Sequence, residues 1–313
     1  MAIRYTNLPD NKSKPFGGAY SVHDRELTSY RDETIRMFTV NNNYTEKNAE
    51  IIKQEFLQTY KQWMFSHFPR INGVEQYTHM CFTQGTTESF YQFYIRYKNK
   101  RLRIAKGEYF FHQMMKGLWF NSKDRFAWLD DEPIKENDVV LLSVPFSDTG
   151  ATPRNLEKLL CDCDKLKVPV MLDLAYINLA VDMSFDLSHP CIEYVVSSLS
   201  KVFPIENHRV GIRLQKQAFE DQLYVINEYN YNYINLLSAY IGIKMMNKFS
   251  ADYVFNKYRS KQLEFCQKLD LVPSYCVYFG LDYSGRFKEY NRGGNGNRLC
   301  FTRIWDGRQK YEL

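Results

Sequence analysis

The fold is indicated by residues 168–176, which read VPVMLDLAY. The apolar run 168–172 is too short for a helix and predicts a strand that is buried on both faces. A carboxylate, Asp173, follows the run directly. Similar apolar runs predict further strands at residues 79–83, 102–105, 139–144, 194–197 and 210–214.

Amphipathic stretches alternate with these apolar runs. Apolar residues at three-to-four spacing predict helices at residues 86–97, 109–118 and 154–165. The alternation of strand and helix is typical of βαβ units, so we predict an α/β fold with a mostly parallel sheet flanked by helices. Because ligands of such sheets bind at the carboxyl ends of the strands, the residues directly after each run are the candidates for a functional site.

The two ends of the chain do not show this alternation of strands and helices. The first residues are polar and interrupted by proline and glycine, which predicts an arm or loop, and a capped helix is predicted to start at Thr45. After Gln215 the pattern is helical up to Leu269, and short β-like segments follow at residues 275–281 and 298–305. We therefore expect an N-terminal arm, a large domain that includes its leading helix, and a small α+β C-terminal domain, at residues 1–44, 45–225 and 226–313.

The composition narrows the class of protein. The chain has 313 residues, of which 44% are hydrophobic and 25% charged, as in ordinary globular proteins. Its net charge of +5 is spread along the chain, so an anionic small molecule is a more natural partner than nucleic acid. The sequence shows no apolar run of the roughly 20 residues that cross a bilayer and no signal-peptide pattern, so we expect a cytoplasmic protein without a membrane partner. Its six histidines lack helical metal-site spacing, so no metal is expected.

Polar residues follow several of the predicted strands. Lys201 comes soon after residues 194–197 and has serines beside it, where desolvation would lower the pKa of its amine and make it nucleophilic. Asp173 needs a partner, either a protonated heterocyclic nitrogen or a backbone N–H. Arg209 has the planar fork that binds a phosphate. For Lys201 and Arg209, the alternatives are a surface lysine and a structural ion pair.

The loop after the first predicted strand contains Gly85, Thr86 and Thr87. A glycine followed by two hydroxyl residues at the start of a helix offers backbone N–H groups, side-chain donors and the positive helix end to an anion. A plain turn with threonine caps is the alternative.

Together these segments resemble the fold-type I pyridoxal-phosphate-dependent enzymes, specifically the class I/II aminotransferase family. The resemblance rests on the order and spacing of several blocks rather than on any one of them. They are residues 85–88, 108–109, 145–150, 173–176, 198–201, 209–211 and 297–299.

The resemblance implies pyridoxal 5'-phosphate as the cofactor and assigns roles to individual residues. Lys201 would hold the cofactor as a Schiff base and shuttle the proton between the substrate Cα and the cofactor. Asp173 would pair with the pyridinium nitrogen, Tyr176 would hydrogen-bond the phenolic oxygen, and Tyr109 would stack on the ring. The phosphate would be held by Gly85, Thr86, Thr87, Ser198 and Arg209.

Other positions concern the substrate and the departures from the family pattern. Arg298 lies where the family keeps the arginine that binds the substrate α-carboxylate, and a surface arginine is the alternative. Ser147 stands where the family usually has the cofactor-binding asparagine, and Asp148 stands where it has proline. Because serine is shorter, one hydrogen bond to the phenolic oxygen is expected to be weakened or lost. Tyr44 is a candidate for reaching the phosphate of a partner subunit.

The expected activity is transfer of the amino group of an amino acid to a keto acid through the Lys201 Schiff base, in a homodimer. Decarboxylation, elimination or replacement, and oxidation use the same cofactor and stay open as alternatives. A non-catalytic relative of the fold is the third alternative.

Overall fold

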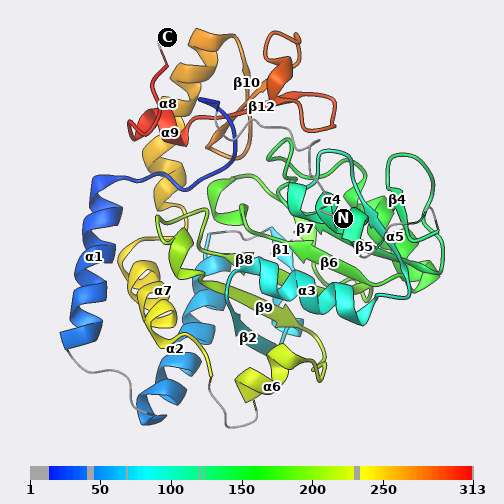
Figure 1. Ribbon diagram of the computed structural model, residues 1–313, viewed down its shortest axis with the longest axis horizontal. Helices are drawn as coiled ribbons and strands as arrows, with labels where there is room; N and C mark the ends of the chain where they lie inside the picture. The colour runs from blue at the N-terminus through cyan, green and yellow to red at the C-terminus, as the bar shows by residue number, and fades with distance from the viewer. Residues whose placement is uncertain are drawn as a thin grey trace, which may run out of the picture.

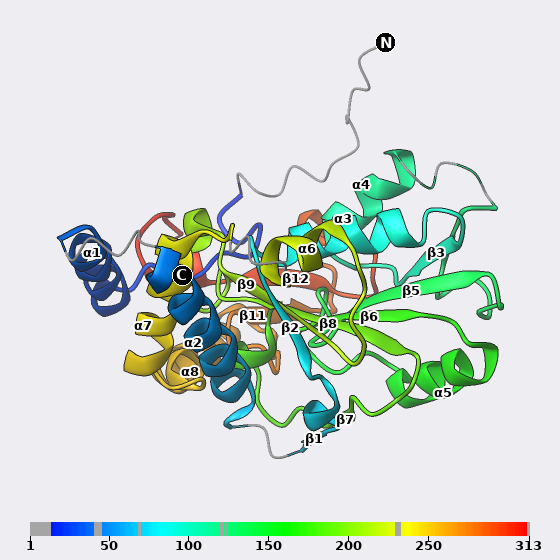
Figure 2. The ribbon, with the colours of Figure 1, turned by 90° about the horizontal axis from the view of Figure 1, so that it is seen from below.

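The computed structural model describes residues 14–40, 46–67, 70–118, 120, 122, 124–228 and 233–311. Its centre is a seven-stranded sheet with the strand order β2-β9-β8-β6-β5-β3-β4 (Figures 1 and 2). The strands are β2 (His79–Thr83), β3 (Arg101–Ile104), β4 (Phe126–Trp128), β5 (Asp138–Ser143), β6 (Val170–Asp173), β8 (Ile192–Ser198) and β9 (Gly211–Gln215). The strands predicted from the apolar runs are therefore confirmed, whereas the short edge strand β4 was not predicted.

The sheet is mostly parallel, as predicted. Strands β4, β3, β5, β6 and β8 pair in parallel, and β9 runs antiparallel to both β8 and β2. Parallel pairing brings the carboxyl ends of β5, β6 and β8 to one edge. There Ser143 pairs with Asp173, and Asp173 pairs with Val196.

Helices cover both faces of this sheet. Figure 2 shows α3 (Thr86–Arg96), α4 (Phe110–Leu118) and α6 (Gln222–Glu228) on one face, and α5 (Leu156–Leu166) on the other. Strand β6 is buried on both faces, because Met171 packs into one hydrophobic cluster while Val170 and Leu172 pack into another. The uninterrupted apolar run of the sequence is thereby explained.

The N-terminal region contains a helix that the sequence pattern did not predict. Helix α1 (Arg25–Val40) replaces part of the expected arm or loop, and it buries only Leu27, Thr34 and Phe38. Asp24 accepts hydrogen bonds from the backbone N–H groups of Glu26 (2.8 Å) and Leu27 (3.3 Å), which caps the helix start. Because so few residues of this helix are buried, its sequence shows little of the apolar periodicity by which a helix is predicted.

Helix α1 packs against the C-terminal part of the chain. The rings of Phe38 and Tyr240 lie 5.1 Å apart, which joins α1 to α7 (Leu236–Lys248). Helix α2 (Glu46–Phe65), the predicted leading helix, lies alongside α7 (Figure 2). Tyr44, the candidate for a contact across a dimer, falls outside the described residues.

The C-terminal tail has the predicted α+β character. Its long helical pattern is divided into α6, α7 and α8 (Tyr253–Leu269), and then an antiparallel sheet follows. That sheet consists of β10 (Val272–Pro273), β11 (Phe279–Asp282) and β12 (Asn297–Cys300), and α9 (Thr302–Trp305) follows it. In Figure 1 these elements stand beyond one end of the large sheet. The division at residues 44 and 225 stays a prediction.

Two short strands and several single-turn helices complete the described elements. Strands β1 (Ile71–Asn72) and β7 (Phe185–Asp186) form a separate parallel pair. No helix in the described ranges combines the length and the apolar character that crossing a membrane requires. The same ranges hold no group of three or more His, Cys, Asp or Glu side chains arranged for a metal ion.

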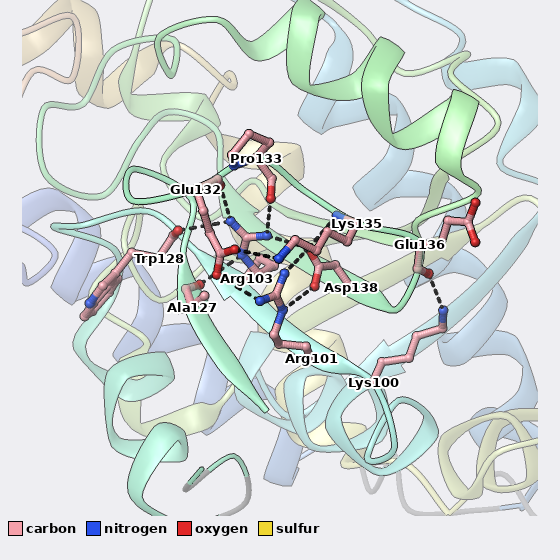
Figure 3. Close-up of polar contacts among 10 residues, drawn as sticks. All are labelled: Lys100, Arg101, Arg103, Ala127, Trp128, Glu132, Pro133, Lys135, Glu136 and Asp138. Carbon is pink, nitrogen blue, oxygen red and sulfur yellow. Dashed lines mark hydrogen bonds and ion pairs between the residues drawn. The ribbon is translucent and has the colours of Figure 1, made fainter. Parts of the chain in front are cut away.

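A buried ion-pair network connects β3, β4 and β5 (Figure 3). Arg103 on β3 is completely buried and forms an ion pair with Asp138 on β5. Its guanidinium also donates to the backbone carbonyls of Ala127 (3.2 Å), Pro133 (3.0 Å), Trp128 (3.1 Å) and Glu132. Arg101 donates to Asp138 as well, at 2.6 Å and 3.1 Å. The network ties the turn after β4 to strands that lead toward the carboxyl edge of the sheet.

Substituting Arg103 tests this network. Arg103→Met removes the cation and leaves buried carbonyl groups without donors, so we expect the free energy of unfolding to fall by about 3–5 kcal/mol in urea titrations. Lys100→Ala is the matched control, because the Lys100 ammonium donates to the carbonyl of Glu136 at an exposed site (Figure 3). It should change the stability by less than about 0.5 kcal/mol. Equal effects of the two substitutions would show that the network is dispensable.

Candidate active site

A cavity of about 90 Å³ lies at the carboxyl edge of the large sheet. Most residues predicted from the sequence line it, although they come from loops far apart in the chain. They are Thr86, Thr87, Tyr109, Ser147, Asp173, Tyr176, Ser198, Lys201 and Arg209. Gly85 adjoins the cavity next to Thr86, and Arg298 lies behind Ser147.

Asp173 and Lys201 carry the most perturbed charges in the cavity. The pKa of Asp173 is raised to about 7, because burial disfavours the carboxylate and the negative charge of Glu108 adds to the effect. The pKa of Lys201 is lowered to about 8 by desolvation and by the positive charge of Arg298. Lys201 Nζ donates to the carbonyl of Ala19 at 2.8 Å. An amine with such a pKa is partly neutral near pH 7 and therefore nucleophilic.

The other end of the cavity is built to receive an anion. Gly85 precedes α3 with φ +75°, and a Cβ there would lie 2.6 Å from Arg209 Nη2. Arg209 Nη2 lies 3.4 Å from Thr87 Oγ1, its only hydrogen-bond partner in the part of the chain that the structure describes. The Arg209 backbone is held in the left-handed region, at φ +55°. A phosphate is bound by hydrogen-bond donors and positive charge. This end of the cavity offers a helix N-terminus, hydroxyl groups and a guanidinium with one long hydrogen bond.

Two tyrosines lie at different depths of the cavity. Tyr176 is buried and its ring packs against Phe279 at 5.4 Å. Burial raises its pKa, so the hydroxyl stays protonated and can donate a hydrogen bond. Tyr109 is 36% exposed and lies at the mouth, in edge contact with His112.

Arg298 approaches the cavity from the small sheet. It lies on β12, is almost completely buried, and donates to the carbonyls of Ser147 and of Gly18, the latter at 3.0 Å. Its guanidinium carbon lies 4.4 Å from the centre of the Phe279 ring. Arg298 is therefore not the surface arginine of the alternative interpretation.

Comparisons with known proteins assign the chain to a family. The family model for aminotransferase class I and II matches residues 105–266, about half of the chain. The chain belongs to the class I and II aminotransferase family. No curated protein gives a significant sequence match.

Solved structures of class I and II aminotransferases and related enzymes share the fold. A pyridoxal-phosphate-bound C–S lyase from Staphylococcus hominis superposes with a TM-score of 0.64 at 14% identity, over 92% of this chain and 82% of that chain. An aminotransferase from Staphylococcus aureus gives 0.63 at 14% identity, over 96% and 94% of the chains. An Escherichia coli protein with a methionine aminotransferase function gives 0.66 at 14% identity, over 92% and 89%. At these identities the likeness establishes the fold.

Class I and II aminotransferases use pyridoxal 5'-phosphate, and the cavity fits that cofactor. At one end is an anion cradle that a Cβ at Gly85 would fill, and at the other end is the buried carboxylate of Asp173. Lys201 lines the same cavity. The donor set therefore offers a partner for each polar end of the cofactor and for its aldehyde.

Some residues of this candidate site were missed by sequence reasoning. Glu108 was part of a quoted block but received no role; it is buried and accepts hydrogen bonds from Ser143 N (2.9 Å), Ser143 Oγ (2.5 Å) and Tyr109 N (2.8 Å). Burial raises its pKa. Its position in the loop after the predicted strand at residues 102–105 was the available signal. No sequence signal could have identified the carbonyls of Gly18 and Ala19, because every residue has a backbone carbonyl.

The lowered pKa of Lys201 predicts a pH profile for the protein without cofactor. The neutral amine reacts, so acetylation of Lys201 by acetic anhydride should rise with a midpoint near pH 8 rather than near the ordinary lysine value of 10.5. Peptide mapping by mass spectrometry over a pH series measures this reaction. In Arg298→Met the midpoint should move upward, because one of the two causes is removed. A wild-type midpoint near the ordinary value would contradict the electrostatic account.

Proposed function

We propose that the protein is an aminotransferase that moves the amino group of an amino acid to a keto acid. One observation carries the proposal: a single cavity joins a lysine amine of lowered pKa, a buried carboxylate and an anion cradle. The family match supports the reaction class.

The residues that line the cavity have complementary roles in this proposal. When bound, pyridoxal phosphate supplies an aldehyde for amine exchange and a ring that accepts electrons from the substrate Cα. Lys201 Nζ would bind that aldehyde and, once the substrate amine has displaced it, take the proton from Cα. Tyr176 would donate to the phenolic oxygen, and Tyr109 would cover the ring face. The phosphate would be held by Gly85, Thr86, Thr87, Ser198 and Arg209.

The raised pKa of Asp173 supports a cationic partner. A carboxyl group with a pKa of about 7 is about half protonated at neutral pH when nothing positive faces it. A protonated ring nitrogen would supply the opposite charge and return the group to its carboxylate form. Asp173 would thereby keep the proton on the ring nitrogen, which strengthens the ring as an electron acceptor.

Arg298 would bind the α-carboxylate of the substrate. In the first half-reaction the substrate loses its amino group and gains a carbonyl oxygen from water, leaving the nitrogen with the enzyme. In the second, a keto acid takes up that nitrogen and releases water, so atoms and electrons balance over the cycle. Both substrates carry the α-carboxylate, so one arginine serves both half-reactions.

The proposal extends to the assembly and the domains. We expect a cytoplasmic homodimer that acts on small amino and keto acids, with an N-terminal segment at residues 1–44 that includes helix α1. The cofactor would be held mainly by residues 45–225, and residues 226–313 would contribute Arg298. Elimination, replacement, decarboxylation and oxidation are the alternative reactions, and similar structures include a C–S lyase and a protein described as a β-cystathionase.

The visible spectrum of the purified protein tests the proposed function. After incubation with pyridoxal phosphate, a yellow band should survive dialysis, and Lys201→Ala should lose it. Addition of a reactive amino acid should bleach the band, and a keto acid should restore it. Release of a thiol from a sulfur-containing amino acid would assign a lyase instead. A colourless protein that cannot be reconstituted would support the non-catalytic relative and end the proposal.

Arg298 predicts a separate effect on substrate binding. Arg298→Met should raise KM for the amino acid roughly 10- to 100-fold, because a charge-assisted hydrogen-bonded pair is worth about 1.5–3 kcal/mol. Steady-state kinetics over a substrate series measures the effect. Arg286→Met is the control, since Arg286 is exposed on the same part of the chain. An unchanged KM in Arg298→Met would remove Arg298 from the substrate site.

A further inference from the structure

A second arginine from the C-terminal part of the chain contacts Ser147, which lines the cavity. Arg292 lies in the glycine-rich loop before β12, and its side chain is only 14% exposed. Its Nη2 donates to Ser147 Oγ at 3.2 Å and approaches the carbonyl of Glu108 at 3.5 Å. Arg292 thus bridges from the tail of the chain to two loops of the large sheet.

The loop that carries Arg292 is shaped for this contact. The Asn291 side chain accepts from Gly293 N (2.9 Å) and donates to the carbonyls of Gly294 (3.2 Å) and Gly296 (3.1 Å). A Cβ at Gly294 would come within 2.1 Å of Asp148 Oδ2, so the loop can approach that closely only with glycine there. The position of Arg292 is therefore built into the fold rather than left to a long free side chain.

The hydrogen-bond chemistry of Ser147 sets the direction of its hydroxyl. A guanidinium can only donate, so Ser147 Oγ must accept from Arg292. The single proton of Ser147 is then available to another acceptor, and no protein acceptor for it is found among the described residues. Ser147 also lines the cavity. The hydroxyl proton is therefore free to donate into the space where the cofactor would lie.

The groups around Arg292 leave its guanidinium positively charged. Burial, and then the positive charge of Arg298, lower the pKa of Arg292 to about 10, and Tyr176, Asp148 and Glu108 act in the opposite direction. Asp148 Oδ1 is 3.8 Å from Arg292 Nε, and neither atom has a hydrogen-bond partner in the part of the chain that is described. The guanidinium remains a cation at neutral pH.

We propose that Arg292 is a positioning residue that acts through Ser147: it holds the Ser147 hydroxyl as a donor to the phenolic oxygen of pyridoxal phosphate. This role rests on the proposed function. It also connects the two departures from the family pattern, because Ser147 accepts from Arg292 and Asp148 faces it. The pair Ser147 and Arg292 would replace one longer side chain.

The experiment is a pH titration of the visible absorption of the protein loaded with pyridoxal phosphate. A donor backed by a cation stabilises the negative phenolic oxygen, and so it eases loss of the proton at the nitrogen that joins Lys201 to the cofactor. R292Q should therefore raise the midpoint of the absorption change by about one pH unit. S147A should raise it by a similar amount, because it removes the same relay.

The double variant separates a relay from two independent effects. If Arg292 acts through Ser147, R292Q/S147A should show the same midpoint as S147A alone. R286Q is the control for loss of a positive charge on the same part of the chain and should leave the midpoint in place. A purely structural role of Arg292 would lower the thermal stability without moving the midpoint.

Several results would overturn the proposed role of Arg292. An unchanged midpoint in R292Q, or shifts that add in the double variant, overturns it. If R292Q does not fold, R292K replaces it: an ammonium cannot reproduce the guanidinium fork, so a shift of about half a unit is expected, and its absence overturns the role. Wild-type protein that binds no pyridoxal phosphate overturns the proposed function itself, whereas bound cofactor with an unmoved R292Q midpoint overturns only the role of Arg292.

Discussion

Holding the Lys201 amine and the buried Asp173 carboxylate in one cavity is the constraint on which the rest of the structure depends. Desolvation disfavours both charges, and it shifts the pKa of Lys201 downward and that of Asp173 upward. Such a pair is held in place only by rigid surroundings. The parallel register of β6 and β8, with Asp173 opposite Val196, supplies this rigidity, because both strands are buried on both faces. The free energy gained by burying the apolar strands thus offsets the free energy lost by desolvating the polar groups at the edge of the sheet.

Segments from the two ends of the chain contact residues that line the cavity. The carbonyls of Gly18 and Ala19 accept from Arg298 and Lys201, and Arg298 in turn donates to Ser147. Residues 14–24 are tied to the tail as well, because Phe16 O accepts from Cys300 N at 2.9 Å. In Figure 1 this N-terminal segment passes beside α8 and α9. The lining residues Lys201 and Ser147 are therefore held by contacts from distant parts of the sequence, and Arg292 adds a second arginine contact to Ser147.

Sequence periodicity predicted the elements that are apolar over most of their length and missed those that are not. The strands β2, β3, β5, β6, β8 and β9 were found because most of their residues are buried, which demands an apolar run. Helix α1 was missed, since only Leu27, Thr34 and Phe38 are buried on it. Asp173, Lys201 and Arg209 were found as polar residues at the ends of such strands. Glu108 was quoted without a role, and Arg292 was not singled out, because a lone arginine in a glycine-rich loop resembles any surface arginine.

The sequence by itself determined the parallel α/β sheet and the residues at its carboxyl edge. Both follow from local patterns, namely the apolar run and the polar residue that ends it. Only the tertiary structure decided which backbone carbonyls face Lys201 and Arg298, that Glu108 shares the interior with Asp173, and that Arg292 reaches Ser147. These contacts join residues that are far apart in the chain or involve backbone groups common to every residue. They depend on how the loops fold over the sheet, and no local pattern encodes that.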